Sequence, residues 1–194
     1  AMVRRIGGET KLSIFDYQQD KLIDLSSKRE LLPRSDSVIE WSGDERFIVY
    51  DIVRGLNTLT VLFDLVDGKP IMISDDLMLE RKKGQTLSCN SANWISNREA
   101  FFACRYSGLS YYNLYLYNVT TGEREIFKSK ILNEIDLFIR DLKIDQKREY
   151  LTFIGSSKDY IEQDIYRYDM NEERIEQLTF SKNKISWLRW YENM

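Results

Sequence analysis

Histidine is absent from this chain. Its absence excludes Ser-His-Asp and Cys-His catalysis, because both need an imidazole as general base. It also excludes most catalytic zinc sites, which take histidine as a ligand. Any acid–base chemistry would have to come from carboxylates, lysine or tyrosine. We therefore expect no cofactor, no metal site and no catalytic activity of the chain's own.

Proline is scarce, with 2 residues in 194, while aromatic residues make up 13% of the chain. This balance predicts an all-β protein with few irregular connections. No apolar run reaches about 18 residues, so no segment is predicted to cross a membrane. The net charge of −3 argues against a nucleic-acid partner. We expect the basic run Arg81-Lys82-Lys83 to be a solvated loop tip.

Cysteine is also rare, and the two residues, Cys89 and Cys104, lie in strand-like contexts. We expect buried free thiols rather than a disulfide. No signal peptide opens the sequence. Ala1-Met2 has the form of a cloning remnant, so the location is left unknown. The protein is expected to be soluble, and extracytoplasmic if a leader or anchor once preceded this sequence.

What the chain does have is a repeat. Four segments read as an alternating apolar strand, an Asp or Asn, a polar turn and a second strand. The spacings between the repeated Asp or Asn residues are 48, 54 and 51, and these residues are Asp16, Asp64, Asn118 and Asp169. A strand-built period of about 50 residues predicts a β-propeller. We expect each Asp or Asn to bond the backbone of its own turn rather than to join a ring of metal ligands.

A second hairpin precedes each internal copy, at residues 38–50, 92–104 and 141–153. Each unit then has four antiparallel strands, which form the blades of a propeller. The predicted fold is a single domain, residues 1–194, with four blades at 36–76, 86–130, 136–181, and 185–194 joined to 2–28. Pairing of the N- and C-terminal strands would close the ring and leave no open edge.

The alternative is a piece of a longer propeller whose exposed edges are capped by another domain or by a second copy. Blade number in the native protein therefore stays open. So does the choice between a monomer and a homodimer.

The repeat resembles those of the TolB and dipeptidyl-peptidase N-terminal β-propeller families. Their Trp-Ser-Pro-Asp-Gly hairpin corresponds here to Trp41-Ser-Gly-Asp44, which lacks the proline. Their Ile-Tyr-x-Tyr-Asp strand and Leu-Thr ending correspond to Ile165-Tyr-Arg-Tyr-Asp169 and Glu176-Gln-Leu-Thr179. The family usually has six to eight blades, more than this chain has room for.

The resemblance implies partner-protein binding, as in TolB, or gating of a serine-hydrolase domain, as in the peptidases. Others in the group bind or cleave sugars. The chain has no Gly-x-Ser-x-Gly elbow and no histidine, so it contains no hydrolase half.

The loops after the second strand of each blade offer a binding surface, because they combine rigid aromatic area with hydrogen-bonding groups. The candidate residues are Arg54, Asn57, Tyr111, Tyr112 and Tyr160. The insert 75–86 carries Leu77-Met78-Leu79 amid charges, which we expect to cap the channel or to touch a partner. Our hypothesis is a non-catalytic module that binds a protein or peptide.

The alternatives are a carbohydrate-binding or carboxylate-based enzyme propeller, or a fragment of a larger propeller that gates a peptidase. A convergent, buried pair of carboxylates in one pocket would favour the enzyme.

Overall fold

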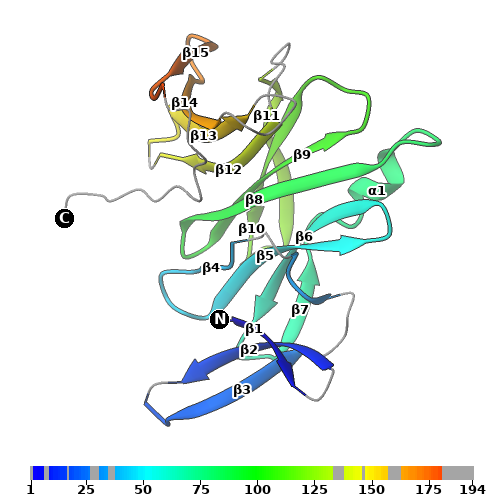
Figure 1. Ribbon diagram of the computed structural model, residues 1–194, viewed down its shortest axis with the longest axis vertical. Coiled ribbons are helices and arrows are strands. Elements are labelled where there is room, and N and C mark those ends of the chain that lie inside the picture. Colours follow the sequence, from blue (N-terminus) through cyan, green and yellow to red (C-terminus); the bar gives the residue numbers. More distant parts are fainter. Residues whose placement is uncertain are drawn as a thin grey trace.

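The computed structural model of this protein describes residues 2–6, 9–16, 18–26, 31–34, 38–132, 138–145, 147–156 and 163–180. The described chain is built almost wholly of antiparallel strands, with one short helix, α1 (Leu77–Glu80) (Figure 1). This confirms the predicted all-β class. Among the described residues, no helix is long and apolar enough to cross a membrane.

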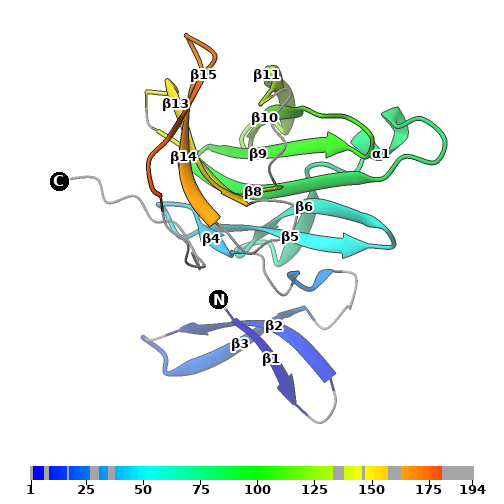
Figure 2. The same ribbon diagram turned by 45° about the horizontal axis from the view of Figure 1, so that its top comes forward.

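The strands fall into groups in which consecutive strands pair antiparallel. The first is a three-stranded sheet at one end of the molecule, made of β1 (Met2–Ile6), β2 (Glu9–Asp16) and β3 (Lys21–Ser26). A four-stranded sheet lies at the other end, made of β12 (Phe138–Ile144), β13 (Tyr150–Ser156), β14 (Gln163–Asp169) and β15 (Arg174–Gln177) (Figures 1 and 2).

Two further groups lie between them. One consists of β4 (Glu40–Trp41), β5 (Phe47–Arg54), β6 (Asn57–Asp64) and β7 (Lys69–Met72). The other consists of β8 (Leu87–Ser96), β9 (Glu99–Tyr106), β10 (Tyr112–Asn118) and β11 (Glu123–Ile131). A parallel contact between Thr58 and Ser88 joins the two groups through β6 and β8. The predicted closing strand, 185–191, lies outside the described residues.

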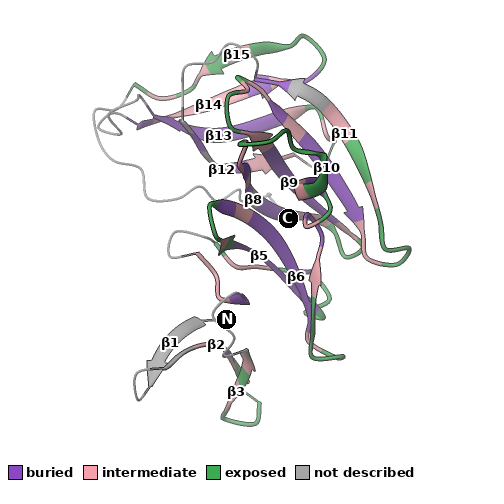
Figure 3. Cartoon of the chain, turned by 90° about the vertical axis from the view of Figure 1, so that its right-hand side faces the viewer, coloured by how far each residue is buried: buried purple, intermediate pink, exposed green. Residues whose placement is uncertain are grey.

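The middle strands are buried on both faces because each group packs against the next. Ile48, Val49 and Tyr50 are successive residues of β5, and each is fully buried. On β9, Phe102 packs in a cluster with β5 and β6, whereas its neighbour Phe101 packs in a second cluster with β12 and β13. Figure 3 shows this burial through β5, β6, β8 and β10, with exposure at the turns. Continuous burial is what a stacked arrangement of sheets requires.

The repeated Asp or Asn closes the same turn in all four copies. In each, one side-chain oxygen accepts the backbone N–H two residues on at 2.9 Å, the donors being Gln18, Val66, Thr120 and Asn171. It also accepts the N–H three residues on, at 3.0–3.2 Å. The predicted local turn role is therefore confirmed.

The cysteines correct one prediction. Cys89 and Cys104 form a disulfide, with 4.1 Å between their Cα atoms, so the expectation of free thiols is wrong. They lie directly opposite each other on the antiparallel pair β8–β9. Opposed residues on neighbouring strands bring their Cβ atoms within bridging range. Whether the two cysteines pair depends on strand register, which cannot be predicted from the number of cysteines.

Loss of the disulfide should lower stability. The bond closes a loop with a sequence separation of 15, and loops of that size gain about 3 kcal/mol of unfolding free energy from cross-linking. The Cys89→Ala/Cys104→Ala double variant should therefore unfold at a lower urea concentration than the oxidised protein. Reduction of the wild type should shift the midpoint in the same direction. Quantitative alkylation of both thiols in unfolded, unreduced protein would contradict the assignment.

Candidate functional site

Three loops at one end of the central strands are bonded to one another. They are the β5–β6 hairpin tip (53–57), the segment around α1 (75–86) and the β9–β10 loop (106–112), and we name them together the α1 face. Arg54 Nη1 lies 2.8 Å from Asp75 Oδ1, which joins the first loop to the second. The hydroxyl of Ser107 accepts the backbone N–H of Thr86 at 2.9 Å, which joins the second to the third.

Arg124 holds the start of α1. This β11 residue pairs with Asp76, lies 3.8 Å from Glu80 and donates to the carbonyl of Ile73 at 3.3 Å. Its guanidinium also lies 5.4 Å from the ring centroid of Tyr115. The hydrogen bond from Arg124 lowers the pKa of Asp76 below its ordinary value of 3.8. At neutral pH this carboxylate is therefore charged and holds the helix against β11.

Tyr106 also holds α1 in place. Its hydroxyl donates to the carbonyl of Leu77 at 2.9 Å. Burial, followed by the charge of Glu80, raises the pKa of Tyr106 to about 12. The phenol therefore stays protonated and keeps its donor over the physiological range.

Large apolar side chains project from this fixed backbone. Leu56 at the hairpin tip is 85% exposed, and Leu79 of α1 is 87% exposed. Val53, near the same hairpin tip, is 49% exposed. Leu77, in contrast, is buried in the core and fastens the helix. Three exposed apolar side chains on loops that are bonded to one another make the α1 face a candidate interaction surface.

The predicted site residues divide into two groups. Arg54 and Tyr111 lie on the α1 face with partly accessible side chains. Asn57 is buried, and its Oδ1 accepts bonds from the backbone N–H of Leu87 and from Arg81. Tyr112 is buried in the core, with the Arg105 guanidinium 5.0 Å from its ring. Tyr160 lies outside the described residues.

Asn57 and Tyr112 are buried, so their side chains support the loops of the α1 face. The register of β10 decides this for Tyr112, because adjacent strand residues point to opposite sides. Sequence reasoning missed Leu56. The available signal was a large apolar residue between Gly55 and Asn57, at the tip of a tight hairpin.

Polar side chains also meet where the first strands of three groups come together. Lys143 of β12 lies 2.6 Å from Glu40 of β4 and 3.9 Å from Asp141, and it donates to Asn93 of β8. The Asn93 amide in turn donates to the carbonyl of Leu142 at 2.8 Å. The Lys143 ammonium lies within ion-pair distance of both carboxylates and balances one of their two negative charges. Its contacts tie three groups of strands together.

A cavity of about 360 Å³ lies at the opposite end of β9–β11, where the repeated turn is. Buried Leu116 forms part of its wall. Glu99 is already paired with Arg148 at 2.7 Å. The remaining lining residues are Asn118, Thr121, Glu123, Arg124 and Glu125. Within the described part of the chain, no group of three His, Cys, Asp or Glu residues is arranged to hold a metal.

Comparison with known proteins bears on the fold. No family model matches the chain, and no curated protein matches it in sequence. TolB from Acinetobacter baumannii is similar in structure, with a TM-score of 0.57 and 12% identity, over 91% of this chain and 39% of that protein.

The β-propeller domain of the Trilobed protease from Pyrococcus furiosus is similar with a TM-score of 0.51 and 14% identity, over 91% of this chain and 52% of that one. The chain thus has the fold of TolB-like β-propellers, which confirms the resemblance found in the sequence. It spans only about 39% and 52% of these two relatives' lengths.

Acid should loosen α1. The pKa of Asp76 is lower in the folded than in the unfolded protein, so its charged carboxylate stabilises the fold at pH values above the unfolded-state pKa. This stabilisation is lost as the pH falls below 3.8 and through the folded-state pKa. Asp76→Asn should therefore lower the hydrogen-exchange protection factors of the Leu77–Leu79 amides at neutral pH. Acid should lower the same protection factors in the wild type, after correction for the slower intrinsic exchange at low pH. Asp67→Asn, an exposed change in the β6–β7 turn, should not. Unchanged exchange in Asp76→Asn would contradict this role.

Proposed function

We propose that the chain is a recognition module that binds a protein or peptide through the α1 face. The observation that carries the proposal is the exposure of Leu56 and Leu79 on loops bonded through Arg54–Asp75 and Arg124–Asp76. Fixed loops lose little entropy on binding, so apolar contact at such a surface yields more net affinity. Arg54 and Tyr111 add the residue types that are enriched at interface hot spots.

A non-catalytic role agrees with the ion pairs that Glu40 and Asp141 form with Lys143. Glu40 and Asp141 are bridged by Lys143, whereas a carboxylate-based enzyme needs an acid and a base that face a shared substrate. The cavity beside Glu123 and Glu125 favours the second candidate, a carbohydrate-binding or carboxylate-based propeller, because it combines carboxylates with an apolar wall.

The Cys89–Cys104 bond supports an oxidising compartment, where such bonds persist. An extracytoplasmic location is therefore part of the proposal.

We also propose that one domain, residues 1–194, forms a four-bladed ring in which residues 185–191 pair with β1. Among the described strands, β1 pairs only with β2, so its other edge could receive a strand. The alternative is a larger propeller, of which this chain is a part.

Removal of the closing segment tests the ring. Deletion of residues 185–194 should lower the free energy of unfolding by on the order of 5 kcal/mol, since it removes a strand ladder and apolar burial. Chemical denaturation measures the difference, with deletion of 192–194 as the matched control. Equal midpoints for the 185–194 deletion and the full chain would contradict ring closure.

The binding surface is tested by selecting partners from a random peptide library displayed on phage. Peptides selected on the wild type should bind Leu56→Asp and Leu79→Asp at least about tenfold more weakly, because hot-spot losses of about 2 kcal/mol or more are typical. Both side chains are exposed, so the melting temperature should hardly change.

Val66→Asp is the matched control, because this exposed residue lies in the β6–β7 turn at the other end of the same strands. If Val66→Asp abolishes binding and the two leucine variants do not, the α1 face is the wrong surface. Binding that depends on Glu123 or Glu125, with turnover of a saccharide, would favour the second candidate.

A further inference from the structure

The acidic side chains around α1 have ion-pair partners, whereas the lysines that follow α1 have none among the described residues. The segment 75–80 contains three carboxylates, and each faces an arginine from another element. Asp75 pairs with Arg54, while Asp76 and Glu80 face Arg124. The two arginines balance two of these three negative charges. One negative charge is left beside Arg81, Lys82 and Lys83, so the segment and its two arginines together carry a net positive charge.

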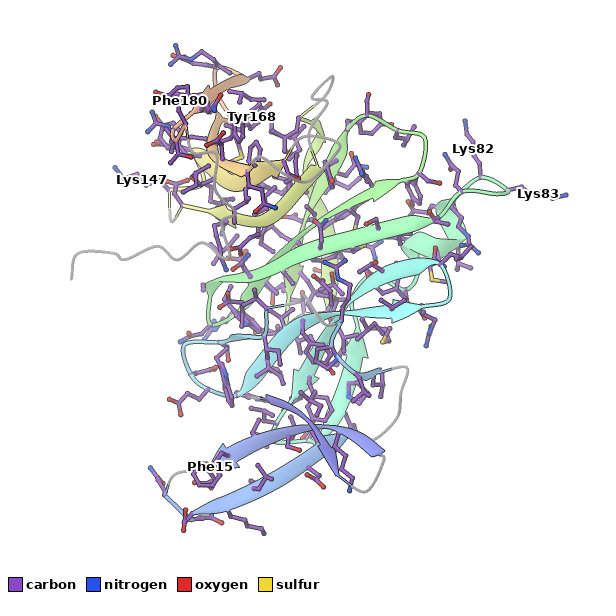
Figure 4. All side chains as sticks on the ribbon, in the orientation of Figure 1. Phe15, Lys82, Lys83, Lys147, Tyr168 and Phe180 are labelled. Atoms are coloured by element: carbon purple, nitrogen blue, oxygen red, sulfur yellow. A yellow bond between two sulfur atoms is a disulfide. The ribbon has the colours of Figure 1, made fainter. Side chains whose placement is uncertain are left out.

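Lys82 and Lys83 form no ion pair among the described residues, and both are exposed. Figure 4 shows them at the tip of the loop after α1, projecting away from the body of the molecule. The turn that carries them is ordered by its own bonds. The backbone N–H of Lys82 donates to Gln85 Oε1 at 3.0 Å, and the Gln85 N–H donates to the Lys82 carbonyl at 3.1 Å.

This tip is fastened to both neighbouring loops. Arg81 donates to Asn57 Oδ1 at 3.1 Å, on the β5–β6 side. The Gln85 amide donates to the carbonyl of Ser107 at 3.2 Å, on the β9–β10 side. Gly84 takes a φ of +85°, a conformation that residues with a Cβ rarely adopt, which allows the tight reversal. The two ammonium groups are thus presented on a fixed support.

We propose that the partner bound at the α1 face is an acidic peptide segment that carries at least one large aliphatic side chain. The inference rests on the proposed function and names the chemistry of its partner. Carboxylates of the segment would meet Lys82 and Lys83, and its aliphatic side chain would lie against Leu79 and Leu56. Complementary charge steers such an encounter, and apolar contact holds the complex.

An anionic membrane is less well matched to this arrangement. Membrane-binding loops bury apolar side chains deepest and keep basic groups at the headgroups. Here the lysine tip projects beyond α1 (Figures 1 and 4), so a flat surface that meets the tip would meet the basic groups before it meets the helix. A nucleic acid is also disfavoured, because the segment 75–86 offers no aromatic side chain for stacking and contains three carboxylates.

Synthetic peptides test the inference. The probe is a fluorescent dodecapeptide of alternating glutamate, aspartate and leucine, measured by anisotropy. A second probe has glutamine and asparagine in place of the acids, and a third has serine in place of leucine. The acidic, leucine-containing probe should bind best, and the amide probe at least about tenfold more weakly. Binding of the acidic probe should weaken as salt rises, because exposed charges are screened.

Lys82→Glu and Lys83→Glu should each weaken binding of the acidic probe by about tenfold and reduce its salt dependence. Lys147→Glu is the charge-matched control. This lysine is exposed and lies in the β12–β13 turn, in a different part of the molecule, so its substitution should have little effect (Figure 4).

Other outcomes overturn the inference in distinguishable ways. If library-selected peptides need Leu56 and Leu79 but are not acidic, the proposed function stands and this inference fails. If vesicles with about 30% phosphatidylserine bind through Lys82 and Lys83 and the acidic peptide does not, the partner is a membrane. If neither the library nor the synthetic probes yield binding that depends on the α1 face, both proposals fail.

Discussion

The structure depends on strands that are buried on both faces. β5, β6, β9 and β10 carry apolar side chains on each side, so none of their groups can be stable without a neighbour. Phe101 and Phe102 illustrate the constraint, because these adjacent residues enter different clusters on opposite sides of one sheet. Packing of each hydrophobic layer against the next therefore determines where the middle strands lie. The ends of these strands hold the loops in defined positions.

The α1 face follows from those fixed positions. Its loops extend from the ends of β5, β9 and their partners, and arginines from two of the strands hold the helix between them. Only some of the charged groups here form ion pairs. The carboxylates pair with arginines and hold the segment in place, whereas the two lysines at its tip form no ion pair among the described residues. The result is a fixed surface with apolar groups and unbalanced positive charge, in a protein whose net charge is −3.

The repeat made the strand order and the turns predictable. Asp16, Asp64, Asn118 and Asp169 each form the expected turn, because that interaction is local and needs only two or three following residues. Features that depend on register were not predictable in the same way. Opposition of Cys89 to Cys104, and burial of Tyr112, follow from which residues face each other across β8–β9–β10. The Arg124–Asp76 contact joins residues 48 positions apart, and no local pattern encodes it.

Amide chemical shifts, followed by NMR during a titration with the acidic, leucine-containing peptide, test the central claim most directly. If the α1 face is the binding surface, the largest changes should occur at residues 53–57, 77–86 and 106–111. The repeated turns at 64–68 and 118–123 lie at the other ends of the same strands and should change little. Changes confined to residues 118–123 and Glu125, around the glutamate-lined cavity, would contradict the account.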